Sequence, residues 1–296
     1  MSGAVLAAAS GIGFGVFQSV NRRAVAEMAV EVATFLQLLT AFAVLVAVAG
    51  AAGDLDRLRT APVGSLAWLA GGGLVHFFVG WTLLNASQKR IGAARTSPLI
   101  AATPMFGVAV AFVTLGEAPS APAWAGIALI SLGAYAVGFG RLARAGAGGW
   151  RNPLFGLGTA CAWSVSPVLI RKGLEGFDSP LVGLTVGLFV SVLAYAAALV
   201  VARRPLLPRR GRVEAGTLSL KVIAGLFVAL STWGRWAALD LTTIGVVLAL
   251  GLMSVPVVLV LSPLVMGRSV ERVTGLIWVG GALVVAGSML LVVRAH

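Results

Sequence analysis

A few polar, charged and aromatic side chains stand inside long apolar stretches of this chain, and their types could bind or move a small solute. His76 lies near the middle of one stretch, where an imidazole can hydrogen-bond a solute or carry a proton. Arg235 can hold a carboxylate with its forked guanidinium, and Asp240 is a second candidate for proton movement. The other candidates for solute binding are indoles and amides: Gln18, Trp81, Asn85, Trp163, Trp233 and Trp236.

The main candidates also have structural interpretations. His76 could bond a neighbouring hydroxyl or carbonyl between packed helices, and Trp163 could fill the core. Arg235 could extend to the membrane surface or pair with a group near Asn21 or Glu31. A charged side chain at mid-membrane costs about 2.5–3.5 kcal/mol on insertion scales, so such side chains usually face a cavity or a partner. Both kinds of interpretation stay open from the residues alone.

The composition indicates a membrane protein with many helices. Of the 296 residues, 59% are hydrophobic and 11% are charged, and the mean hydropathy is +0.99. A soluble domain carries about 25% charged residues, and even a domain of about 300 residues leaves roughly a quarter of its extended surface exposed. Since a membrane-spanning helix uses about 20 apolar residues, the chain has enough for up to ten.

Residues that are scarce exclude several kinds of site. The single cysteine, Cys161, excludes a disulfide framework and a cysteine-based metal cluster, and we expect neither a metal nor a cofactor. The net charge of +12 comes from basic residues in short loops, where they orient helices, so we expect no nucleic-acid partner. The pattern Gly11-x-Gly13-x-Gly15 has no Lys-Ser/Thr after it and predicts close helix packing, not a phosphate loop. The first stretch has no basic leader, and we expect it to stay as a helix.

Ten apolar stretches are separated by charged or Pro/Gly-rich breaks, and each predicts a helix, because backbone in hydrocarbon must satisfy its own hydrogen bonds. They are 3–22, 32–51, 64–87, 93–115, 121–140, 153–172, 180–202, 218–241, 244–266 and 273–293. Residues 203–216 form the longest polar connection, and residues 141–152 form the joint between two halves.

The two halves contain similar features in the same order. The first and sixth stretches end at the basic pairs Arg22-Arg23 and Arg171-Lys172, and an Ile-Gly pair precedes the fourth stretch and begins the ninth. We predict one five-helix repeat in residues 1–146 and a second in residues 147–296. An odd number of helices per repeat makes the second copy enter the membrane from the opposite side, and the basic loops reverse their bias as such an inversion requires. The predicted fold is an all-α integral membrane protein with ten transmembrane helices, arranged as two inverted five-helix repeats around a central cavity. Its basic face is expected to be cytoplasmic, with both termini outside.

The chain resembles the EamA-type proteins of the drug/metabolite transporter superfamily, and bacterial exporters of amino acids, aromatic ones included, are similar in length and layout. The resemblance rests on a Pro…Gly-Glu…Gly…Gly signature, present as Pro104, Gly116-Glu117, Gly126 and Gly133, with a second copy at Pro256, Gly267, Gly275 and Gly281. It implies a carrier of ten helices with inverted repeats and a central cavity. Two departures put carboxylate-based proton exchange in doubt: Arg268 stands where the second Glu is expected, and the first helix offers Gln18 where small relatives have a proton-coupling Glu.

These observations predict a secondary transporter that exports small metabolites, amino acids first among them, across a bacterial cytoplasmic membrane by alternating access. Its partners would be the small-molecule substrate and the lipid bilayer, and the fused repeats would let one chain act as a monomer. Carriers of drugs, nucleosides or sugars are the alternatives within the same fold. A membrane-embedded lipid-modifying enzyme is an alternative of another class, but it needs grouped Asp, Glu and His residues, and the carboxylates here lie mostly in loops beside arginines. We therefore expect no enzyme.

Overall fold

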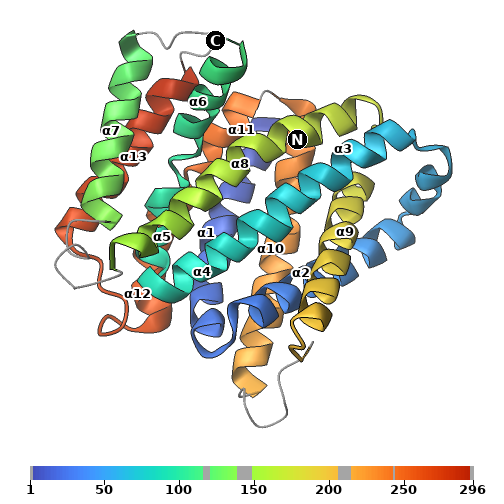
Figure 1. The fold of residues 1–296 in the computed structure, drawn as a ribbon, viewed down its shortest axis with the longest axis horizontal. Helices are drawn as coiled ribbons and strands as arrows, with labels where there is room; N and C mark the ends of the chain where they lie inside the picture. Colours follow the sequence, from blue (N-terminus) through green and yellow to red (C-terminus); the bar gives the residue numbers. More distant parts are fainter. Residues whose placement is uncertain (1–2, 116–120, 139–148, 206–214, 243, 294–296) are drawn as a thin grey trace.

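The computed structural model describes residues 3–115, 121–138, 149–205, 215–242 and 244–293, and every regular element in these ranges is a helix (Figure 1). The first half holds α1 (Gly3–Glu27), α2 (Val30–Ala51), α3 (Val63–Gly73), α4 (Trp81–Ile91), α5 (Ala93–Ile100), α6 (Thr103–Leu115) and α7 (Ala121–Gly138). The second half holds α8 (Asn152–Glu175), α9 (Pro180–Val201), α10 (Ala215–Leu241), α11 (Ile244–Gly251), α12 (Ser254–Met266) and α13 (Gly275–Val293). A π-helical turn, Leu74–Gly80, joins α3 to α4, and short 3-10 helices cover Asp54–Thr60 and Gly149–Arg151.

Several of these helices can cross a membrane, which makes the chain a multi-pass membrane protein. Seven spans are long and apolar enough in the described residues: Gly3–Glu27, Val30–Ala51, Val63–Ile91, Asn152–Glu175, Pro180–Val201, Ala215–Leu241 and Val246–Met266. The count of ten spans and their inverted arrangement stay predictions. The proposed boundary between residues 146 and 147, the Gly116-Glu117 pair, and much of the connections 141–152 and 203–216 lie outside the described residues.

The fourth and ninth predicted stretches are each broken in two, which corrects the expectation of continuous helices. The first break lies between α5 and α6. Pro104 has no N–H to donate to the carbonyl of Ile100, and the Thr103 hydroxyl donates to that carbonyl instead, at 2.6 Å. The second break lies between α11 and α12. Pro256 likewise cannot donate to the carbonyl of Leu252, which accepts a bond from the N–H of Val255 at 3.0 Å.

The two halves of the chain pack on each other through matching pairs of helices. α1 packs along α10 and α3 packs along α8, while α2 contacts α9 and α7 contacts α13. Figure 1 shows α7 and α13 together on one side of the molecule and α2, α3 and α9 on the other, with α1 and α10 between them. In the two predicted repeats, α1 corresponds to α8, and α3 with α4 corresponds to α10. The contact of α1 with α10 therefore matches the contact of α3 with α8, as a two-fold relation between the repeats would require.

α1 and α10 run antiparallel and form the centre of the fold. Gly3 at the start of α1 lies against Thr242 just after α10, and near the other end the Thr217 hydroxyl donates to the Glu27 carboxylate. Midway, the Ser10 hydroxyl donates to the backbone carbonyl of Ser231 at 2.5 Å. These three contacts fix the heights of the residues of α1 and α10 relative to each other along the bundle.

Candidate functional site

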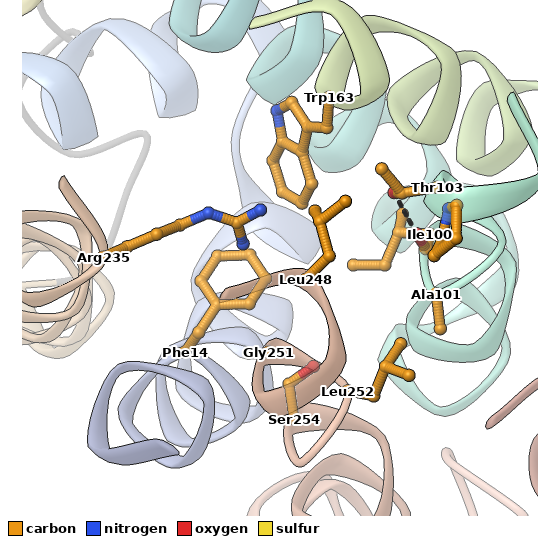
Figure 2. Close-up of a pocket in the computed structure, with 11 residues that line it drawn as sticks. Phe14, Ile100, Ala101, Thr103, Trp163, Arg235, Leu248, Gly251, Leu252 and Ser254 are labelled. Carbon is orange, nitrogen blue, oxygen red and sulfur yellow. Dashed lines mark hydrogen bonds between the residues drawn. The ribbon is translucent and has the colours of Figure 1, made fainter. Parts of the chain in front are cut away.

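Two adjoining small cavities lie at the centre of the helix bundle. Both are lined by Phe14, Trp163, Arg235 and Gly251, so α1, α8, α10 and α11 contribute to each. The cavity in Figure 2 measures about 30 Å³ and the second about 20 Å³. A water molecule needs roughly 10–15 Å³ by such a measure, so the space as it stands holds one or two waters and no larger solute.

An indole and an imidazole form one wall of this space. The Trp163 ring stacks on His76 with 5.1 Å between centroids and an interplanar angle of 14°, and its edge meets Phe14 at 5.4 Å. The Trp163 Nε1–H donates to the backbone carbonyl of His76 at 3.1 Å, and His76 Nδ1 lies 2.8 Å from the Ser166 hydroxyl. The structure thus brings two predicted site residues together and fixes the orientation of both rings.

The π-helical turn carries His76 to this position. Such turns are often found at functional sites. At the end of the turn, a Cβ on Gly80 would stand 2.3 Å from Trp163 Nε1, so only glycine leaves room for the indole here. Neither the π turn nor the close approach at Gly80 was predicted from the sequence.

Arg235 supplies the charge of the site. Its guanidinium extends from α10 toward the space between Phe14 and Trp163 (Figure 2), and its side chain lines both cavities. Among the described residues it makes no ion pair and no side-chain hydrogen bond, so neither Asn21 nor Glu31 neutralises it. A guanidinium at this depth with no protein partner is suited to an anionic group of a solute.

The two broken helices meet at the same place. Residues at both breaks line the larger cavity, Ala101 and Thr103 from the first and Gly251, Leu252 and Ser254 from the second. Interrupted helices at the middle of a membrane bundle leave backbone groups free to meet a solute, and they occur at the binding sites of other transporters. Their signals in the sequence were Pro104 and Pro256, which were interpreted there as marks of the repeat.

The other predicted aromatic residues differ in position. Trp81 lines the smaller cavity and stacks on Phe17 at 5.9 Å. Trp236 is fully buried against Phe77 and lines neither cavity, and Trp233 is 41% exposed on the outer surface of α10. Helical periodicity explains the difference, because neighbouring residues of one helix point in different directions.

The remaining predicted residues lie away from the two cavities. Asp240 is in the last turn of α10, near the end of the helix. Asn85 and Gln18 are fully buried, and Asn85 belongs to a polar cluster that also contains Lys221. Lys221 was not a predicted site residue, although its position inside the apolar stretch 218–241 is a signal in the sequence.

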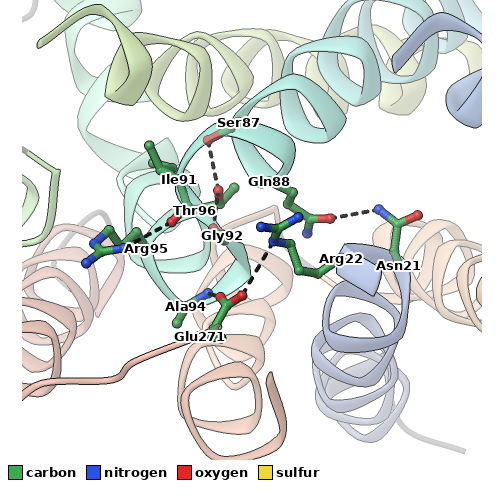
Figure 3. Close-up of polar contacts among 10 residues, drawn as sticks. All are labelled: Asn21, Arg22, Ser87, Gln88, Ile91, Gly92, Ala94, Arg95, Thr96 and Glu271. Atoms are coloured by element: carbon green, nitrogen blue, oxygen red, sulfur yellow. Dashed lines mark hydrogen bonds and ion pairs between the residues drawn. The ribbon is translucent and has the colours of Figure 1, made fainter. Parts of the chain in front are cut away.

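An ion pair joins the two halves at the end of the bundle nearest Glu27. Arg22 of α1 lies 3.4 Å from Glu271, which precedes α13, and Glu271 also accepts the N–H of Ala94 at 2.6 Å (Figure 3). Gly92, with a φ of 85°, passes so close that a Cβ there would stand 2.7 Å from the Glu271 carboxylate. Glu271 thus places a buried carboxylate between the two halves, three residues after Arg268.

At the opposite end, Arg171 of α8 donates to the carbonyls of Leu239 and Thr242, at 2.5 and 3.0 Å. These bonds satisfy free carbonyls at the C-terminus of α10. Because α8 and α10 both belong to the second half, these bonds lie within it. The halves are joined at this end by Arg57, whose side chain donates to the carbonyl of Asp178 at 2.9 Å, and at the other end by the Arg22–Glu271 pair.

Comparison with known proteins supports a transporter fold. No curated protein matches the chain significantly. A solved structure described as "Crystal structure of protein" aligns over 95% of this chain and 95% of its own, at 20% identity and a TM-score of 0.59, which shows a shared fold. Residues 1–139, a little under half of the chain, match the EamA-like transporter family.

Proposed function

We propose that this chain is a secondary transporter that exports small metabolites across a bacterial cytoplasmic membrane, and that amino acids, aromatic and other apolar ones included, are its substrates. The position of Arg235 carries the choice of substrate class. Its guanidinium has no partner among the described residues and lines a cavity beside the rings of Phe14 and Trp163. A guanidinium binds a carboxylate with two parallel hydrogen bonds, and aromatic rings bind an apolar or aromatic side chain.

The mechanism we propose is alternating access. The present cavities are too small for an amino acid, so the substrate must enter after one end of the bundle opens. Rocking of one five-helix half, residues 1–146, against the other, residues 147–296, would break the Arg22–Glu271 pair on one side or the Arg57–Asp178 contact on the other. One chain contains both halves and so acts as a monomer, with no cofactor.

We further propose that protons enter the cycle through His76 and not through Asp240. His76 lines the smaller cavity beside Arg235, whereas Asp240 lies in the last turn of α10. A titratable ring in contact with the substrate space can change its charge as the space opens to one side or the other.

Uptake of labelled phenylalanine into liposomes that hold the purified protein tests the role of Arg235. We expect Arg235→Met to lower uptake roughly 10- to 100-fold, because a hydrogen bond to a charged group contributes about 1.5–3 kcal/mol. The matched control is Arg59→Met, which removes an arginine whose side chain is 83% exposed and should leave uptake unchanged.

Equal uptake by Arg235→Met and the wild type, at equal amounts of inserted protein, would remove Arg235 from the substrate site. Saturable uptake of nucleosides, sugars or drugs in place of amino acids would contradict the substrate class and leave the transporter assignment standing.

A further inference from the structure

Lys221 is a second cationic residue inside the bundle, on α10 between the central cavities and the end of the bundle nearest Glu27. The ammonium group of Lys221 donates to Asn21 Oδ1 and to Gln37 Oε1, the latter at 2.7 Å, and the residue is 1% exposed. It makes no ion pair among the described residues, and Glu27, a carboxylate at the same end of the bundle, accepts the Thr217 hydroxyl instead. A lysine near a helix end normally extends to water, so a buried and unneutralised one needs an explanation.

Neutral side chains from three helices surround this lysine. Asn21 Nδ2 donates to Asn85 Oδ1 and to Gln88 Oε1, both at 2.7 Å, and Asn85 Nδ2 donates to Thr34 Oγ1 at 2.8 Å. Figure 3 shows the contact between Asn21 and Gln88. The Lys221 cluster, as we call it, consists of Asn21, Thr34, Gln37, Asn85, Gln88 and Lys221.

The cluster has donors to spare and no negative charge. Each of its side-chain oxygens already accepts a bond, whereas the amide nitrogens of Gln37 and Gln88 are buried without any partner. Both residues are 0% exposed. Buried polar groups are normally paired, and unpaired ones call for a ligand or water. A positive charge with surplus N–H groups is complementary to an anion.

The cluster continues toward the cavities along two helices. Lys221 and Arg235 are fourteen residues apart on α10, close to four turns, so they share a face about 21 Å apart. On α1, Phe14, Gln18 and Asn21 also share a face, and Gln18 between them is fully buried with both its amide atoms unpaired. The polar groups thus form a series from the Lys221 cluster to the Arg235 cavity.

We propose that the Lys221 cluster is an anion-binding site that takes a small monovalent anion, a carboxylate or a halide. During transport, the cluster would bind the carboxylate of a solute that enters from the end of the bundle nearest Arg22, before the solute reaches Arg235. This role rests on the proposed function. The binding itself does not, because it follows from the charge and the free donors of the cluster.

Thermal unfolding of the purified protein in detergent tests the site without any transport. Sodium chloride and sodium acetate are compared with sodium gluconate at equal ionic strength, since gluconate is too large for a fully buried cluster. A ligand that binds only the folded state raises the Tm with its concentration, and we expect a rise of about 2–5 °C for the wild type. A larger effect of acetate identifies a carboxylate site, and a larger effect of chloride identifies a halide site.

Lys221→Met is the main variant, because replacing a buried charge with an apolar side chain of similar shape usually leaves a protein folded. Lys221→Gln removes the charge and keeps hydrogen-bonding groups, which covers the case in which Met does not fit. Wild type and variants are compared in an Arg235→Met background, so that an anion in the central cavity does not contribute. There we expect both Lys221 substitutions to lose the anion-dependent rise, and Lys172→Met, at an exposed lysine, to keep it. A rise of equal size in the Lys221 variants, or none in the wild type, would overturn the site. The unfolding experiment does not measure uptake of amino acids. The anion site and the proposed function can therefore be confirmed or contradicted independently of each other.

Discussion

At the residue scale, the site contains some side chains that the sequence marked as candidates and others that it did not. His76, Trp163 and Arg235 stood out because the bilayer penalises them, and the structure places all three around one cavity. Their partners did not stand out. The hydroxyl of Ser166 and the ring of Phe14 are ordinary residues for a membrane helix, and only the packing of α8 and α1 brings them to the site.

Asn85 and Lys221 show why residue types alone do not locate a site. Asn85 was predicted to bind the solute, but its amide is occupied by Asn21 and Thr34 in the Lys221 cluster. Lys221 was not among the predicted site residues, and a lysine near a helix end can usually reach water. The burial of both depends on contacts between helices far apart in sequence, which no local pattern contains.

His76 is the residue whose titration we expect to couple transport to protons. An imposed pH gradient should increase phenylalanine uptake by the wild type, and His76→Gln should abolish the increase, because the amide can still bond Ser166 but cannot change its charge. Asp240→Asn should keep the increase, since Asp240 lines neither cavity. Gradient-stimulated uptake that survives in His76→Gln would show that another group carries the proton.

At the scale of the element, hydropathy predicted where helices lie but not where they are irregular. Helices occupy each of the ten apolar stretches, with α1 extending to Glu27 instead of residue 22. The irregular segments are the π turn at Leu74–Gly80 and the breaks at Ala101 and Leu252, and all three contribute residues to the cavities or border them. Proline explains the breaks in retrospect, whereas the π turn depends on packing against α8.

Gly80 tests whether the close approach of the π turn to α8 matters for transport. In Gly80→Ala the new methyl group must displace the Trp163 indole, which breaks its bond to the His76 carbonyl. We expect a severalfold loss of uptake with normal membrane insertion. Gly71→Ala is the matched control on the same span, because nothing lies within 4 Å of the added Cβ. Equal uptake by the two variants would show that the position of the indole is unimportant.

At the scale of the whole molecule, the sequence predicted the class of protein more securely than its internal symmetry. Composition alone indicated a helical membrane protein, since too few charged residues exist to cover a soluble fold. The pairing of α1 with α10 and of α3 with α8 is the arrangement that two related halves would produce. The Arg22–Glu271 pair and the Arg57–Asp178 contact join the halves at opposite ends of the bundle, and their breaking on alternate sides is the motion that the proposed transport requires.

The most direct test of the account is competition for phenylalanine uptake in liposomes that contain the wild-type protein. Phenylpropionate keeps the ring and the carboxylate of the substrate, and phenethylamine keeps the ring and the amine. Because Arg235 is the unpaired charge of the cavity, we expect phenylpropionate to inhibit saturable uptake and phenethylamine to inhibit it at least tenfold less well. Equal inhibition by the two compounds, or no uptake above protein-free liposomes, would contradict the proposal that the cavity binds the carboxylate of an amino acid.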